Sequence, residues 1–313
     1  MIDYSPLTTP IAFFIFNRPD TTARVFDAIR KARPTKLLVV ADGPRPDRRG
    51  EEEVCAATRA AIEDVDWPCE VLTNYSEFNL GCKRRVASGL DWVFDTVNEA
   101  IILEDDCLPE PTFFPYCAEL LDRYRDDTRI FLISGDNFQR GKRYGAASYY
   151  FSRYPHVWGW ASWRRAWRNY DASLRAWVDA DNREPYLSRF ETPNERAFWT
   201  AAWDAVTTGG LDTWDYQLAF TAATQDQLCI VPQVNLVTNI GFGKDATHTV
   251  RRSRLANLPT RPMDFPLVHP EHVLQSHAAD TVTRRQFFRL PPAPVRWAKA
   301  GLQVLQRRLQ RRT

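Results

Sequence analysis

Three adjacent carboxylates, residues 104–106, directly follow the apolar run Ala100–Leu103 in the stretch "EAIILEDDCLPEP". No Lys or Arg lies within residues 99–111 to balance their charge. Neighbouring carboxylates repel each other, and some take up protons unless a cation sits among them. Carboxylate oxygens suit Mg²⁺ or Mn²⁺, which bind one or two protein carboxylates together with substrate phosphates and water. The triplet therefore predicts a divalent metal site, although an isolated EDD is more often the solvated start of a loop.

Polar residues also follow three other apolar runs along the chain. These are Asn17-Arg18, Asp42-Gly43 and Asp136-Asn137. The apolar runs alternate with amphipathic helical patterns, which is typical of βαβ units and a parallel sheet covered on both faces. Such sheets bind ligands beyond the carboxyl ends of their strands, where the strand order reverses. The four polar strand ends predict a binding crevice at one edge, and they favour the metal site over the solvated loop.

Composition and length set limits on the function classes. The chain has 313 residues, of which 44% are hydrophobic and 26% charged, as in a folded globular protein. No apolar window of about 18 residues predicts a membrane span, and the N-terminus lacks the regions of a signal peptide. The six cysteines show no CxxC or Cys/His metal spacing, which indicates a reducing compartment. We therefore expect a cytoplasmic protein.

The last 20 residues, 294–313, carry six basic side chains and no acid, so the rest of the chain is net acidic. This distribution argues against nucleic acid as the main partner. Apolar residues fall on one face of this tail, which predicts a helix on the cytoplasmic face of the membrane. A helix packed on the body or a solvated basic end stays open as the alternative. We expect a domain over residues 1–250 with two halves, residues 1–140 and residues 141–250. A Pro-rich wrap and this basic amphipathic helix then occupy residues 251–313.

A series of sequence blocks resembles one enzyme family. They occur in the family's order, and they are "IFNRPD", "VVADGP", "NLGCKRR", "AIILEDDCLPEPTFFPYCAELLDRYRDD" with "IFLISGDN", "WGWASWRRAW", "TWDYQ" and "NIGFGKDATHT". Together they resemble the DxD region and flanking blocks of GT-A glycosyltransferases. The similarity is closest to the N-acetylglucosaminyltransferases that begin complex N-glycans and to bacterial HlpA-like nucleotide-diphosphosugar transferases. It spans about residues 11–250. The resemblance implies a GT-A fold, which is α/β and Rossmann-like, with a mostly parallel sheet flanked by helices and a C-terminal elaboration. It makes residues 1–140 the nucleotide-sugar half of the domain and residues 141–250 the acceptor half.

The resemblance also implies roles for individual residues of the strand ends. It makes Asp106 the metal ligand and gives Glu104 and Asp105 to the sugar and ribose. An extended backbone would point Asp105 away from its two neighbours, so the three can divide these duties. Arg18 and Asp42 match positions that grip the base and ribose. From the residues alone, Asp42 can accept hydrogen bonds from a uracil imide and Arg18 can stack or reach phosphate. An ordinary turn is the alternative at Asp42.

A predicted helix N-terminus supplies a candidate diphosphate site. Asn79 precedes a helix whose first turn holds Lys83, Arg84 and Arg85. Helix N-termini attract anions, whereas bases in a first turn oppose the helix dipole. We therefore expect Asn79 and Lys83 near the donor, with a solvated basic face as the alternative.

A catalytic base is predicted in the block "LDTWDYQ". An inverting transfer needs a base on the acceptor hydroxyl. The family's base follows a Trp in a comparable block, which makes Asp215 the candidate and Asp212 its rival. The block is not identical, because Tyr216 stands where the eukaryotic enzymes tend to carry a second acid.

Two further assignments come from the second half of the chain. His248 matches a C-terminal His that completes the metal or diphosphate site in many GT-A enzymes, with a structural His as the alternative. Trp160, Trp163 and Trp167 recur at helical spacing, which is more typical of core. The resemblance nevertheless places the Gly159-Trp160 pair beside the donor sugar.

These features predict a metal-dependent glycosyltransferase that uses Mn²⁺ or Mg²⁺ and inverts the sugar. The donor is a nucleotide-diphosphate sugar, with UDP-N-acetylglucosamine the first choice by resemblance alone, and the acceptor is a hydroxyl of a glycan, lipid-linked molecule or protein. Surface polysaccharide or glycoconjugate synthesis is the setting we expect. The alternatives are a metal-dependent phosphohydrolase or nucleotidyltransferase and a non-catalytic nucleotide-sugar-binding protein. Against the first alternative, the sequence has no P-loop, no Gly-rich pyrophosphorylase loop and no DxDx[TV] signature.

Overall fold

Strands and helices alternate through the first half of the chain in the computed structural model, which describes residues 6–242 and 255–288. The strands are β1 (Ile11–Ile15), β2 (Lys36–Ala41), β3 (Glu70–Tyr75), β4 (Glu99–Glu104), β5 (Cys107–Pro109), β6 (Ile130–Ser134), β7 (Tyr149–Ser152), β8 (Trp160–Trp163), β9 (Leu228–Pro232) and β10 (Val237–Asn239). The helices are α1 (Pro19–Ala32), α2 (Glu51–Ala60), α3 (Gly81–Thr96), α4 (Phe113–Arg123), α5 (Arg164–Trp167), α6 (Arg175–Val178), α7 (Glu184–Leu187), α8 (Pro193–Thr207), α9 (Asp215–Thr224) and α10 (His277–Phe287). His248 and the predicted basic tail helix lie outside the described residues.

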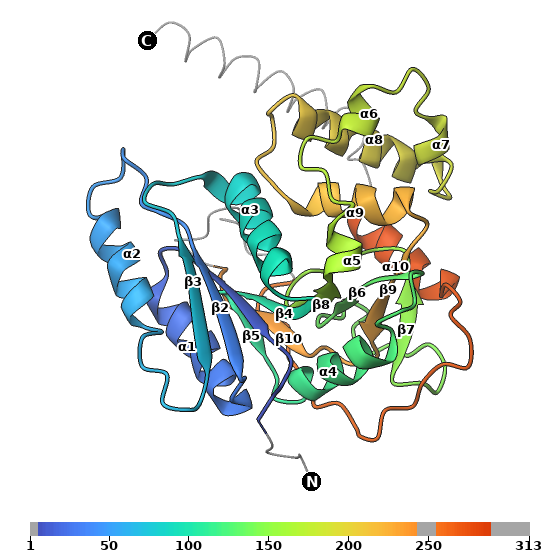
Figure 1. The fold of residues 1–313 in the computed structure, drawn as a ribbon. Helices are drawn as coiled ribbons and strands as arrows, with labels where there is room; N and C mark the ends of the chain where they lie inside the picture. The colour runs from blue at the N-terminus through green and yellow to red at the C-terminus, as the bar shows by residue number, and fades with distance from the viewer. Residues whose placement is uncertain (1–5, 243–254, 289–313) are drawn as a thin grey trace, which may run out of the picture.

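The main sheet has eight strands in the order β3-β2-β1-β4-β8-β6-β9-β7. Strand β1 pairs in parallel with β2 on one side and with β4 on the other. Strands β2 and β3 are added on one side of β1, and β4 is added on its other side. The strand order therefore reverses between β1 and β4. Strands β8 and β7 run antiparallel to their neighbours. The predicted fold class, an α/β Rossmann-like, mostly parallel sheet flanked by helices, is confirmed (Figure 1).

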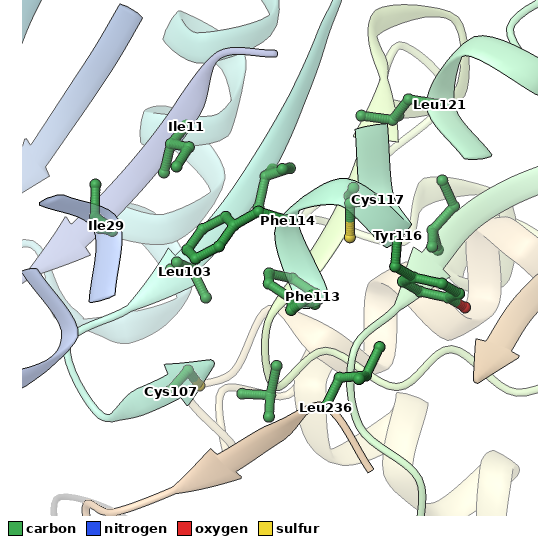
Figure 2. Close-up of a cluster of buried hydrophobic side chains, with 14 of the residues drawn as sticks. Ile11, Ile29, Leu103, Cys107, Phe113, Phe114, Tyr116, Cys117, Leu121 and Leu236 are labelled. Atoms are coloured by element: carbon green, nitrogen blue, oxygen red, sulfur yellow. The ribbon is translucent and has the colours of Figure 1, made fainter. Parts of the chain in front are cut away.

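Alternate residues of β1 face opposite sides of the sheet, and both sides are buried. Ile11, Phe13 and Ile15 belong to one hydrophobic cluster, whereas Ala12 and Phe14 belong to another. The first cluster is covered by α1 and α4, and Figure 2 shows α4 side chains packed against the strand residues. The second cluster is covered by α3 and α9. An apolar run without alternation, as in β1, is what a strand buried on both faces requires.

A third hydrophobic cluster joins the short helices α6 and α7 to α8 and α9. Its large rings include Trp177, Trp199 and Trp203. The tryptophan-rich second half is therefore mostly core. Trp160, Trp163 and Trp167 are also buried, which confirms that they belong to the core, although Trp160 and Trp163 lie on strand β8 and not on a helix. The reason is that a three-residue step also fits a short strand whose neighbouring layers bury both faces.

Residues after the main sheet fold back onto it. The two-stranded sheet of β10 and β5 pairs Asn239 with Cys107, which brings the chain after β10 next to the acid triplet. Helix α10 lies within the segment expected to be an irregular wrap, and it contacts β7. No helix among residues 6–242 and 255–288 is long and apolar enough to cross a membrane.

Candidate active site

A cleft of about 570 Å³ lies beyond the carboxyl ends of β1, β2 and β4, where the strand order reverses. Its volume is within the range of small-molecule sites. One side, which we call the strand edge, consists of residues 14–18, 40–45 and 104–106. The opposite side, which we call the loop wall, consists of residues 157–158, 212–215 and 239–242. The cleft is where an open α/β sheet of this connectivity binds its ligands.

The acid triplet lies at the centre of the strand edge, and one guanidinium contacts it. The Nη1 atom of Arg18 is 2.6 Å from Oδ2 of Asp106 and 3.5 Å from Oδ1 of Asp105. Strand β4 ends at Glu104, so the backbone does not stay extended through the triplet. Asp105 is buried and accepts a hydrogen bond from the Phe16 backbone N–H at 3.1 Å. Arg18, which follows β1, is thus the balancing charge that the local sequence lacks.

One guanidinium does not neutralise three carboxylates, and the pKa values of the acids reflect this. Burial, followed by the charges of its two neighbours and of Asp215, raises the pKa of Glu104 to about 8. Burial and the charge of Asp106 raise the pKa of Asp105 to about 7, against the opposing effects of Arg18 and the Phe16 N–H. The triplet therefore either retains protons near neutral pH or accepts further positive charge.

Asp42 follows β2 and holds the loop before α3. Its carboxylate accepts hydrogen bonds from the N–H groups of Gly43 and Leu80, each at 2.9 Å, and from Nδ2 of Asn79 at 3.0 Å. The same Asn79 amide donates to the Gly43 carbonyl. Asp42 and Asn79 both line the cleft, as predicted from the strand end and the helix start. The hydrogen bond between them fixes the orientation of both side chains. Burial raises the pKa of Asp42.

The basic residues Lys83 and Arg85 in the first turn of α3 lie in different environments. Arg85 is buried, lines the cleft and donates to the Asn74 carbonyl at the end of β3 at 2.5 Å. Lys83 is only partly exposed, and its backbone N–H donates to Oδ1 of Asp212 at 3.2 Å. Arg85 is among the described residues that line the cleft, whereas Lys83, which the sequence predicted there, is not.

Asp215 and its rival Asp212 both lie on the loop wall. Oδ1 of Asp215 accepts hydrogen bonds from the Thr213 hydroxyl and from the Tyr216 N–H. No hydrogen bond within the described part of the chain reaches Oδ2 of Asp215. Asp212 instead accepts from the first turn of α3 and is exposed to solvent. Asp215 and Glu104 line the same cleft, and the charge of Asp215 contributes to the raised pKa of Glu104.

The Gly159-Trp160 pair lies behind the cleft surface. Gly159 has a φ of +64°, which favours glycine, and a Cβ there would be 2.7 Å from a Val237 methyl group. Trp160 is buried and stacks on Trp214 at 5.8 Å between ring centroids. Trp158, which sequence reasoning passed over, lines the cleft instead and contacts the Phe242 ring.

One predicted strand end does not reach the cleft. Asp136 and Asn137 follow β6 and are buried, and Asn137 donates to the Pro232 carbonyl at 2.5 Å. The prediction of four aligned strand ends is therefore wrong for this one. Strand β8 lies between β4 and β6 and runs antiparallel, so the end of β6 is two strands away from the triplet.

Other cleft residues have weaker sequence signals. Arg45 pairs with Glu51, which also accepts from the Asn17 amide at 2.9 Å. Asn239 donates to Oδ1 of Asp106 at 3.3 Å, and Gly241 follows it. Asn239 is the last residue of the short strand β10, in which it follows Val237 and Thr238, so no apolar run marked it in the sequence.

The acid triplet fits a divalent cation only if other ligands complete the coordination of that cation. No group of three or more His, Cys, Asp or Glu side chains in residues 6–242 and 255–288 is arranged to hold a metal ion. Mg²⁺ and Mn²⁺ do not need such a group when substrate phosphates and water complete the coordination. The all-oxygen, excess-negative triplet therefore fits a cation that shares a bound diphosphate. His248 lies outside the described residues and stays a prediction.

No protein-family model and no curated protein matches the chain. Among solved structures, a UDP-glucose pyrophosphorylase complexed with UDP-glucose aligns with a TM-score of 0.33 and 8% identity over 72% of this chain and 90% of that one. The mannosyltransferase PcManGT from Pyrobaculum calidifontis, in complex with GDP-Man and Mn²⁺, aligns with a TM-score of 0.38 and 12% identity over 71% and 72% of the two chains. By their names both are nucleotide-sugar enzymes, but similarity at these scores carries no argument about activity.

Proposed function

We propose that this protein is a metal-dependent glycosyltransferase that transfers a sugar from a nucleotide-diphosphate sugar to an acceptor hydroxyl with inversion. The observation that carries the proposal is the pairing of an under-neutralised acid triplet on the strand edge with Asp215 on the opposite loop wall of one cleft. The sequence blocks of the GT-A family support it independently. UDP-N-acetylglucosamine is the first donor to test.

In this proposal, the strand edge holds the donor. Asp42 and Asn79 shape the subsite for the base and ribose, because their mutual hydrogen bonds fix the loop before α3. Asp106 is the carboxylate for Mn²⁺ or Mg²⁺, while Glu104 and Asp105 orient the sugar and ribose. The divalent cation, when bound, offsets the charge that develops on the departing diphosphate.

The loop wall holds the acceptor and removes its proton. The hydrogen bonds to Oδ1 fix the orientation of the Asp215 carboxylate and leave Oδ2 for the acceptor hydroxyl. Asp215 takes the hydroxyl proton as the oxygen attacks the anomeric carbon, and the bond from that carbon to the diphosphate breaks in the same displacement. Asp212 is the weaker candidate for the base, because its side chain is exposed to solvent whereas Asp215 is half-buried.

The experiment is to incubate the protein with UDP-N-acetylglucosamine, Mn²⁺ and pools of glycan, lipid-linked and peptide acceptors, and to identify every product. A transferase gives UDP together with a heavier acceptor. UMP and a sugar phosphate indicate a phosphohydrolase, whereas UTP formed after addition of pyrophosphate indicates a nucleotidyltransferase. Donor binding without any product in all acceptor pools indicates a non-catalytic binding protein.

The matched variants are Asp106→Ala and Asp127→Ala. We expect the first to lower metal-dependent turnover by about 1000-fold, because it removes a group that acts on charge developing in the transition state. Asp127 is a carboxylate paired with Arg129 away from the cleft, so its variant should retain turnover. Normal turnover by Asp106→Ala would remove the metal role from this residue.

A further inference from the structure

The carboxylate proposed for the cation is already engaged by the protein's own positive charge. Arg18 Nη1 lies 2.6 Å from Asp106 Oδ2, and the exposed fractions of the two side chains are 18% and 16%. The other oxygen, Oδ1, accepts from Nδ2 of Asn239 at 3.3 Å and contacts Sγ of Cys107 at 3.5 Å. A partly buried pair of this kind is screened much less than a surface ion pair. Both oxygens of Asp106 therefore have partners within the protein.

The backbone after β10 leaves little room above this pair. The Ile240 N–H donates to the Asp106 carbonyl at 2.8 Å, which holds the chain over the triplet. A Cβ atom on Gly241 would overlap Asp106 Oδ2 and would be 2.8 Å from Arg18 Nη1. A cation therefore cannot approach Oδ2 from this side while the guanidinium stays where it is.

We propose that Arg18 blocks divalent-cation binding at Asp106 until a diphosphate draws the guanidinium away, so that cation and nucleotide bind cooperatively. The inference rests on the proposed function, because it assigns the cation to Asp106 and the diphosphate to the same cleft. It adds a property that the proposed function does not require, namely that Arg18 keeps the cation from binding alone.

Charge explains why the diphosphate is needed. A cation that arrives alone must displace a guanidinium and then remain close to it, and like charges repel at such distances. A diphosphate provides new oxygen partners for Arg18, which suits bidentate phosphate contacts. It also provides oxygen ligands for the cation. Each ligand therefore removes part of the obstacle to the other, and thermodynamic linkage makes the effect reciprocal.

The test measures Mn²⁺ binding to the full-length protein from the electron paramagnetic resonance signal of free Mn²⁺. We expect saturating UDP to tighten Mn²⁺ binding to the wild-type protein by about 10- to 100-fold, a usual range for coupled sites. Inorganic pyrophosphate should produce most of this effect, because the diphosphate is the part that draws Arg18. In Arg18→Gln, Mn²⁺ alone should bind more tightly than to the wild type, and the tightening by UDP should be smaller than in the wild type, since only the direct oxygen ligands of the diphosphate then contribute.

Two variants control for loss of folding and for general charge effects. Arg18→Lys keeps a cation on the same element and should retain weak binding of Mn²⁺ alone. Arg129→Gln removes a guanidinium that pairs with Asp127 outside the cleft, and it should leave the affinity for Mn²⁺ alone unchanged. Equal affinity of the wild type and Arg18→Gln for Mn²⁺ alone would overturn the block while leaving the proposed function intact. If Mn²⁺ binds under none of these conditions, the proposed function falls as well.

Discussion

The two sides of the cleft fix their charged groups in different ways. On the strand edge, Asp42 accepts three hydrogen bonds and Asp105 is tied to the Phe16 backbone, so distant segments meet at each carboxylate. On the loop wall, Asp215 is held by residues next to it in sequence, and Asp212 is exposed. The strand-edge carboxylates are therefore held by contacts from distant segments, whereas Asp215 on the loop wall is held by its own sequence neighbours. Substitutions on the two sides should therefore differ in their effects on the transfer rate, on ligand affinity and on stability.

The largest effect should come from Asp215→Asn on the loop wall. An asparagine has nearly the same shape but cannot take a proton, and loss of a general base costs about 100- to 10,000-fold. Donor affinity should stay within about twofold in this variant, because transition-state and ground-state contributions separate in such measurements. Initial rates of sugar transfer and calorimetric titration with UDP and Mn²⁺ check the two halves of the prediction.

Asp212→Asn is the matched control for this prediction. It should transfer sugar at a rate close to that of the wild type, since its carboxylate accepts a backbone hydrogen bond that an asparagine oxygen can also accept. A reversal, with Asp212→Asn inactive and Asp215→Asn active, would assign the base to Asp212. Equal, severe losses of donor binding in both variants would show that the loop wall also positions the donor.

A smaller effect is expected from pH, through a histidine behind the loop wall. His156 is buried against the Phe138 and Phe287 rings, and burial lowers its pKa to about 4. As pH falls from about 6.5 to 4, the unfolded chain gains a proton at this residue that the folded protein does not accept. Stability should therefore fall over this window, by about 3 kcal/mol from His156.

Chemical denaturation at several pH values measures this contribution as the difference between the wild type and His156→Phe. The variant should lose part of the decline between pH 6.5 and 4, whereas His272→Gln, at an exposed side chain, should keep it. A wild-type slope in His156→Phe would mean that other groups dominate acid destabilisation.

The sequence predicted the strand edge well because its signal is local. Each polar group directly follows an apolar run, so Arg18, Asp42 and the acid triplet are found without knowing any contact. Asp136 shows the limit of this rule. It also follows an apolar run, but β8 inserts antiparallel between β4 and β6, and no local pattern announces a strand that arrives from later in the chain.

The loop wall was harder to predict because its residues depend on tertiary placement. Asn239 and Gly241 reach the triplet only because β10 pairs with β5. The tryptophans illustrate the same difficulty, since spacing alone did not distinguish Trp160 in the core from Trp158 at the cleft. The contact of Arg18 with Asp106 spans 88 residues, so the sequence left the triplet without a counter-charge that the fold provides.

Substitutions on the two sides of the cleft should also change the free energy of unfolding by different amounts. Asp42→Asn places an NH₂ group or a weaker acceptor among three N–H donors in a buried position, which should lower the free energy of unfolding by about 2 kcal/mol. Asp212→Asn on the exposed loop wall should change it by less than about 0.5 kcal/mol. Urea denaturation of both variants at neutral pH makes the comparison. Similar values would show that contacts from distant segments do not hold the strand edge more firmly.

The smallest effect is expected at Gly241, where the loop wall touches the strand edge. Its Cβ in Gly241→Ala would overlap Asp106 Oδ2, so residues 239–242 must move outward from the triplet. We expect combined UDP and Mn²⁺ affinity to fall by about tenfold, or about 1.4 kcal/mol, with little change in unfolding free energy. Gly210→Ala is the control, because its nearest neighbour would be the Ala205 carbonyl at 3.4 Å. If Gly241→Ala binds UDP and Mn²⁺ as tightly as the wild type, residues 239–242 can move without affecting binding. The strand edge alone would then determine donor binding.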